Sequence, residues 1–198
     1  NILEANKSTL EEATQWISGH KQTWISFHPL LYPDFPDKFA GPGLARKTGM
    51  DLAVSRFNYL DRPGGIITSL DADTTVDPNY LQAIQEAFSQ DQKCTGCNVH
   101  FEHPFDVDDF HSSPAGISSA VTNAIIQYEL HLRYYIQALR YTGFPYAFHT
   151  VGSVFSVRTD AYVRQGGMNR RKAGEDFYFL QKLIPLGGFR EIHSTTVY

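Results

Sequence analysis

Residues 65–73 read Gly-Ile-Ile-Thr-Ser-Leu-Asp-Ala-Asp. The apolar residues predict a buried strand that ends in two carboxylates, Asp71 and Asp73. Because residues i and i+2 of a strand point to the same side, both acids can face one cation. Magnesium and manganese prefer oxygen ligands, and magnesium is commonly held by one or two carboxylates together with substrate phosphates. The segment suggests a metal site for a phosphorylated substrate, and an acidic turn after an ordinary strand is the alternative.

The rest of the chain alternates predicted helices with predicted strands. Helices are expected over residues 8–17, 44–57, 118–140 and 177–184 and from residues 77–78 onward; strands are expected over residues 23–27, 94–105, 147–157 and 189–197, with a loop over residues 29–43. This alternation is typical of an α/β fold with a mostly parallel sheet flanked by helices. We expect one domain over residues 1–198, with its active site at the carboxyl ends of the strands.

The composition narrows the class of protein. The chain has 17 Lys and Arg against 21 Asp and Glu, for a net charge of -4. These charges are scattered, so nucleic acid is not an expected partner. The sequence has no apolar run long enough to cross a bilayer, so no transmembrane segment is expected in it. We expect a cytoplasmic protein, with the cytoplasmic face of the membrane as an alternative location.

Cys94 and Cys97 lie close to His100 and His103, which raises the question of a zinc site. However, the residues after Val99 look extended, and residues three apart in a strand face opposite sides. Two reduced structural thiols are the simpler interpretation.

Two further segments carry charged residues at predicted helix starts. Glu175 and Asp176 follow a glycine, where the helix dipole stabilises carboxylates; one of them can cap the helix or accept a proton from a hydroxyl. Arg46 and Lys47 follow a glycine-containing loop, where free N–H groups and a guanidinium can bind phosphate. A solvated basic pair is the alternative for the second segment.

The order of these segments resembles that of the family 2 glycosyltransferases. The motifs run Gly43-x-Ala45-Arg46, Asp71-x-Asp73, Asn79-Tyr80, Thr150-Val-Gly-Ser153, Gly166-Gly-Met168 and Gly174-Glu-Asp-Phe-Tyr-Phe-Leu180. The resemblance covers about residues 41–184 and implies the A-type nucleotide-diphospho-sugar transferase architecture. It implies transfer of a sugar from a nucleotide-sugar donor to a carbohydrate or lipid-linked acceptor, with inversion, as in the synthesis of a cell-envelope polysaccharide.

The resemblance also implies roles for individual residues. Asp71 and Asp73 match the pair that holds Mn²⁺ or Mg²⁺ at the donor diphosphate, with Asp73 as the more direct ligand. Asp176 matches the catalytic base, and Glu175 helps to shape the acceptor site.

Two further residues receive roles from the same resemblance. Arg46 matches a basic residue on the donor side, and His193 stands where some relatives supply a further metal ligand. Because relatives begin with a strand-helix-strand unit that this sequence lacks, we expect an internal fragment, truncated at both ends.

Two rival interpretations remain. Asp71 and the acid two residues later also fit the first motif of haloacid-dehalogenase-like phosphatases, although substantial structured chain precedes them here. The chain can also be a non-catalytic fragment that binds a sugar or a partner, since the unit that reads the nucleotide base is not found in the sequence.

Overall fold

The computed structural model describes residues 2–32, 34–104 and 119–198. The chain divides into two compact units, Asn1–Ala40 and Gly41–Tyr198. All the candidate site residues named above belong to the second unit.

The first unit consists of helix α1 (Ile2–Gly19) and an irregular segment. The helix begins well before Ser8, whose hydroxyl donates to Glu12 within the helix (3.4 Å). The strand predicted over residues 23–27 is wrong, because the described part of this unit holds no second strand to pair with. Phe27 instead packs edge-on against Trp16, with the ring centroids 5.3 Å apart.

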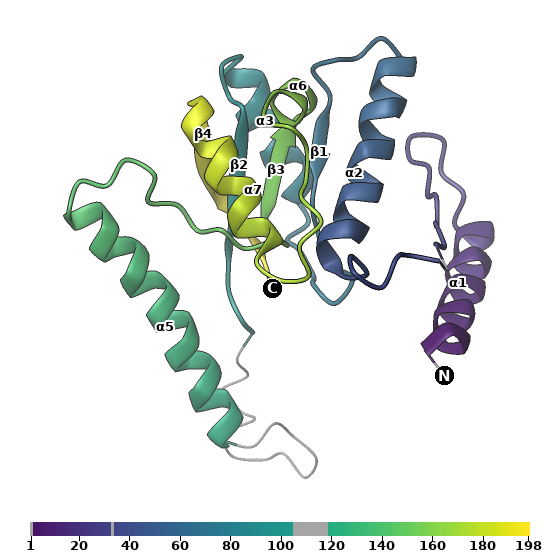
Figure 1. The fold of residues 1–198 in the computed structure, drawn as a ribbon, viewed down its shortest axis with the longest axis horizontal. Helices are drawn as coiled ribbons and strands as arrows, with labels where there is room; N and C mark the ends of the chain where they lie inside the picture. The colour runs from purple at the N-terminus through teal and green to yellow at the C-terminus, as the bar shows by residue number, and fades with distance from the viewer. Residues whose placement is uncertain (1, 33, 105–118) are drawn as a thin grey trace. The chain divides into compact units, whose positions relative to one another are not determined.

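The second unit is built on a four-stranded sheet (Figure 1). Its strands are β1 (Ile66–Thr68), β2 (Gly96–Phe101), β3 (Phe155–Arg158) and β4 (Phe189–Val197), in the order β1-β3-β2-β4. β3 is antiparallel to β1 and β2, whereas β2 is parallel to β4. The α/β class is confirmed. The sheet is mixed rather than wholly parallel: β1, β2 and β4 run in the same direction, as expected, and β3 runs against them. Buried strands are apolar whichever way they run, so the sequence pattern does not report their direction.

The helices largely match the sequence pattern. They are α2 (Pro42–Tyr59), α3 (Tyr80–Gln90), α5 (Ser119–Tyr141), α6 (Thr159–Arg164) and α7 (Glu175–Leu183), with the short 3-10 helix η1 (Ile184–Leu186) after α7. Helix α6, which directly follows β3, was not expected from the sequence. Residues 105 and 118, at two predicted boundaries, lie outside the described residues.

The sheet is covered on both faces (Figure 1). On one face, α2, α6 and α7 form a core that includes Met50, Tyr162 and Phe179. On the other face, α3 packs through residues such as Ile84 and Phe88. The core therefore lies in two layers, with the sheet between them.

Two predicted boundaries differ because tertiary contacts replace local structure. The helix expected from residues 77–78 onward begins at Tyr80, with Asn79 as its N-cap. Asp77 Oδ2 instead accepts a hydrogen bond from the backbone N–H of Thr196 (2.7 Å), which ties this segment to β4. The strand predicted over residues 147–157 is reduced to β3, and residues 147–154 are irregular.

The turn before β4 offers a test of how the fold constrains glycine. Gly187 and Gly188 both have a left-handed backbone, with φ of 83° and 71°. A Cβ on Gly188 would overlap the backbone carbonyl oxygen of Lys93, whereas one on Gly187 would meet nothing within 4 Å. We expect Gly187→Ala to lower the free energy of unfolding by about 2 kcal/mol, because φ of 83° with ψ of 168° is a combination that almost only glycine adopts. Gly188→Ala should lower it by about 3 kcal/mol, because the backbone must also move. Urea denaturation measures both, and equal losses would contradict this account.

Candidate functional site

The acidic pair lies in a turn rather than on a strand. β1 ends at Thr68, and the Thr74 backbone N–H and hydroxyl both donate to the backbone carbonyl oxygen of Asp71 (3.3 and 2.7 Å). Asp71 is partly buried and Asp73 is exposed. The prediction that both side chains leave one face of a strand is therefore wrong, because the chain turns between them.

Arg46, on the first turns of α2, connects three distant parts of the chain. Its Nη2 donates to Asp71 Oδ1 (2.6 Å) and its Nε to Glu175 Oε1 (3.1 Å). Its Nη1 donates to both the Ser69 hydroxyl (2.6 Å) and the Gly152 carbonyl oxygen (2.9 Å). Because a guanidinium has five N–H donors, these four bonds leave little for a phosphate. These contacts indicate that Arg46 acts as a clamp, a side chain that holds the site residues in position, rather than as the predicted direct contact with the donor.

Helix α2 reaches this position because its first turn packs closely on the loop before α7. Pro42 starts the helix with a favourable backbone angle. A Cβ on Gly43 would overlap the carbonyl oxygen of Arg171 and lie 3.0 Å from the Cβ of Glu175. A glycine is needed at position 43 for this close approach of α2 to the loop, and the approach places Arg46 next to the start of α7.

Glu175 and Asp176 have different surroundings although they are neighbours at the start of α7. Glu175 is buried (5% exposed) and pairs with Arg46. Asp176 lies in the wall of a pocket, and its Oδ1 accepts a hydrogen bond from the backbone N–H of Phe177 (2.7 Å). Burial raises the pKa of Asp176, the charge of Glu175 adds to this rise, and Arg46 partly opposes it. Asp176 is therefore a better proton acceptor than an ordinary aspartate, and it is the one of the two that lines the pocket.

The backbone at Gly152 lies close to the side chains of Arg46 and Asp176. A Cβ at this position would lie 2.7 Å from Arg46 Nη2 and 3.3 Å from Asp176 Oδ2. Gly152 and Ser69 are therefore parts of the site to which sequence reasoning gave no role. Gly152 lies in the Thr150–Ser153 motif, and that motif was the feature of the sequence that could have pointed to it.

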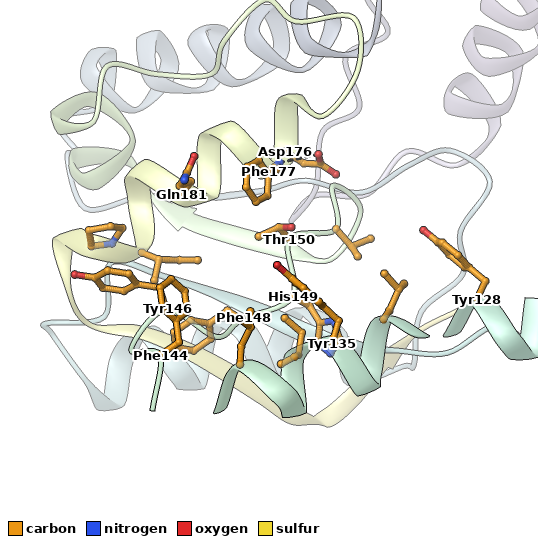
Figure 2. A pocket seen from close by; sticks show the side chains of 16 residues that line it. Tyr128, Tyr135, Phe144, Tyr146, Phe148, His149, Thr150, Asp176, Phe177 and Gln181 are labelled. Carbon is orange, nitrogen blue, oxygen red and sulfur yellow. Dashed lines mark hydrogen bonds between the residues drawn. The ribbon is translucent and has the colours of Figure 1, made fainter. Parts of the chain in front are cut away.

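A cavity of about 710 Å³ lies next to this cluster. Its walls come from α5, residues 144–151, α7 and η1. Figure 2 shows Asp176 and Phe177 on one side, Tyr135 on the opposite side, and Phe144 and Tyr146 toward the far end. The volume is in the range of pockets that hold small organic ligands.

The irregular wall of this cavity is held by side chains from other elements. Asn98 Nδ2 donates to the carbonyl oxygen of His149 (3.2 Å), and Arg46 binds the carbonyl of Gly152. Burial lowers the pKa of His149, so its imidazole is neutral near pH 7. These bonds replace the strand pairing that was expected over residues 147–154.

His193 lies apart from the acidic turn. It is exposed on β4, at the opposite edge of the sheet from β1, with its ring centroid 5.9 Å from that of His100. Both residues line a second, smaller cavity of about 170 Å³. Nothing in these contacts brings His193 to Asp71 or Asp73, and its metal role stays a prediction.

The described part of the chain shows no group of three or more His, Cys, Asp or Glu placed to hold a metal, either at the acidic turn or elsewhere. Cys94 and Cys97 are buried free thiols. Burial raises the pKa of both, that of Cys97 to about 12. Burial and a raised pKa are typical of unreactive structural thiols.

Comparison of the chain with models of known protein families gives no match, and comparison with curated protein sequences gives none either. Within the described residues, none of the helices combines the length and the apolar character needed to span a bilayer.

The clamp can be tested by a double-mutant cycle. Arg46→Met should lower the free energy of unfolding by about 3 kcal/mol, because it leaves the buried carboxylate of Glu175 without its partner. Adding Glu175→Gln removes that charge, so the double variant should be more stable than the sum of the single losses predicts, by about 1 kcal/mol or more. Lys47→Met is the matched control, since its i,i+4 pair with Asp51 is worth about 0.5 kcal/mol or less. Strictly additive losses in urea denaturation would show that Arg46 and Glu175 are not coupled.

The environment of Asp176 predicts a pH-dependent gain in stability for Asp176→Asn. A carboxyl whose pKa is raised on folding disfavours the native state once it ionises, so its stabilising effect is present at acid pH and is lost as the pH rises. Asparagine keeps the acceptor for the Phe177 N–H without the charge. We expect a gain of the order of 0.5 kcal/mol at pH 7 that shrinks toward the ordinary pKa of aspartate. Melting curves of the unaltered and the Asp176→Asn proteins from pH 4 to pH 8 measure this gain. A gain that grows on acidification would contradict the prediction.

Proposed function

We propose that the Gly41–Tyr198 unit is a metal-dependent glycosyltransferase domain. It transfers a sugar from a nucleotide-diphosphate donor to a hydroxyl of an acceptor. The proposal is carried by one observation: a single guanidinium, that of Arg46, contacts Asp71 in the acidic turn and Glu175, the neighbour of the pocket-lining Asp176. A donor-side acid and an acceptor-side acid are thus held in one cluster.

Asp176 serves as the base that activates the acceptor. Its raised pKa makes it a better proton acceptor than an exposed aspartate, and its position in the cavity wall gives it access to a bound hydroxyl. The hydrogen bond from the Phe177 N–H holds one carboxylate oxygen, so the other is available for the proton.

The charges of the cluster support a requirement for a divalent cation. Three carboxylates, those of Asp71, Glu175 and Asp176, gather around the one guanidinium of Arg46. This excess of negative charge repels a diphosphate. The free oxygen of Asp71 and the exposed carboxylate of Asp73 are the ligand type that Mn²⁺ and Mg²⁺ prefer. When bound there, such an ion neutralises the departing nucleoside diphosphate.

The roles of the two acids in α7 support inversion. A double displacement requires a second carboxylate as nucleophile, as in retaining glycosidases. Glu175 is buried in its pair with Arg46 and is not available for that role. Because Asp176 is the one carboxylate among the described residues that line the cavity, direct attack by the acceptor oxygen is the simpler pathway.

Titration calorimetry with manganese and UDP, or with GDP, tests the donor side. We expect at least one nucleotide to bind in the presence of Mn²⁺ and to be released by a chelator. Asp73→Ala should weaken that binding by about tenfold or more, whereas Asp160→Ala, which removes an exposed acid on α6, should not. Asp73 is chosen because Asp71 also pairs with Arg46.

Asp176→Asn separates binding from catalysis. The variant should bind nucleotide normally while the rate of sugar transfer, followed as nucleoside diphosphate release, falls about 10²- to 10⁴-fold. Absence of nucleotide binding by the unaltered chain would favour the non-catalytic alternative. A phosphoryl group trapped on Asp71 would favour the phosphatase.

A further inference from the structure

The cavity beside Asp176 is apolar over most of its wall. Its aliphatic side chains come from α5, residue 151 and η1, and include Leu132, Ile136, Leu139, Val151 and Ile184. Among the described residues that line it, Asp176 is the only acidic or basic side chain apart from the neutral His149.

The aromatic side chains extend this apolar surface away from Asp176. Phe144 and Tyr146 pack edge-to-face with ring centroids 5.7 Å apart, and Figure 2 shows them at the far end of the cavity from Asp176. Thr150, Gln181 and three tyrosine hydroxyls add polar groups to the lining, but most of the wall is made of carbon atoms, and Asp176 carries its one charged group among the described residues.

A saccharide chain matches this wall poorly. Each sugar ring carries several hydroxyl groups, and a hydroxyl that leaves water needs a hydrogen-bond partner. Aromatic faces alone can stack on sugars, but the aliphatic side chains Leu132, Ile136 and Leu139 offer no such partners. An aliphatic chain gains from burial against the same wall.

We infer that the acceptor is a lipid alcohol, whose aliphatic chain occupies the cavity and whose hydroxyl lies at Asp176. The inference rests on the proposed function for the reaction, though not for binding. In the reaction the acceptor oxygen forms a bond to the anomeric carbon of the nucleotide-sugar, and the bond from that carbon to the diphosphate oxygen breaks. The hydroxyl proton passes to Asp176, and the nucleoside diphosphate leaves with the bonding electrons.

Binding of simple alcohols tests this without donor, metal or catalysis. The probes are 1-hexanol, 1-octanol and 1-decanol, measured by displacement of the neutral fluorescent ligand N-phenyl-1-naphthylamine from the intact chain. Cellobiose serves as the saccharide probe. We expect affinity to rise about fourfold for each added methylene, and cellobiose to displace nothing.

Two variants of α5 locate the binding. Leu139→Trp fills the cavity and should weaken 1-decanol binding at least tenfold. Leu130→Trp places the same side chain at an exposed position of the same helix and should leave binding unchanged. The chain-length series on the unaltered protein remains a test if Leu139→Trp does not fold.

The outcomes separate the two proposals. Displacement by cellobiose and not by alcohols overturns the lipid acceptor while leaving sugar transfer intact. The lipid acceptor is also overturned if the affinity does not change with the chain length of the alcohol, or if both tryptophan variants bind 1-decanol equally well. If the alcohols bind as expected but no nucleotide binds in the manganese titration, the lipid-binding site is supported and the proposed transferase function is overturned.

Discussion

The hydrogen bonds of the Arg46 guanidinium are the constraint on which the site depends. They join the turn after β1, the start of α7 and the irregular segment before β3 through Asp71, Glu175 and Gly152. These groups are far apart in the sequence, and Asp71, Gly152 and Glu175 themselves all lie outside the strands. The planar fork of an arginine can hold several acceptors at once, which a lysine cannot do. The clamp therefore defines both the position of the acids and the shape of the cavity wall.

The clamp also explains how two adjacent acids take different roles. Successive residues of a helix point about 100° apart, so at the start of α7 one carboxylate faces α2 and the next faces the cavity. Glu175 is neutralised by the guanidinium, whereas Asp176 feels burial and the charge of its neighbour, which raise its pKa. Environment, rather than residue type, separates a carboxylate buried in an ion pair from one that faces the cavity with a raised pKa.

Local patterns in the sequence predicted most helices and the last strand. α2, α5 and α7 follow from apolar periodicity and from the glycine and proline residues at their ends. The direction of β3 and the turn at Asp71 did not follow, because both depend on partners distant in the sequence. Arg46, Asp71, Glu175 and Asp176 could each be selected from the sequence as charged residues at a predicted strand end or helix start. Their joint geometry, with Gly152 as the point of close approach, required the fold.

The wall over residues 147–154 shows why a cavity forms where a strand was expected. A segment rich in Val, Phe and Thr can pair as a strand, but its backbone carbonyls at His149 and Gly152 accept hydrogen bonds from Asn98 and Arg46. Buried backbone groups must be satisfied by some partner, and side-chain donors satisfy these two without requiring a neighbouring strand. The segment is then free to bend away from the sheet, and its apolar side chains line open space. The charged clamp and the apolar cavity are thus two consequences of the same hydrogen bonds.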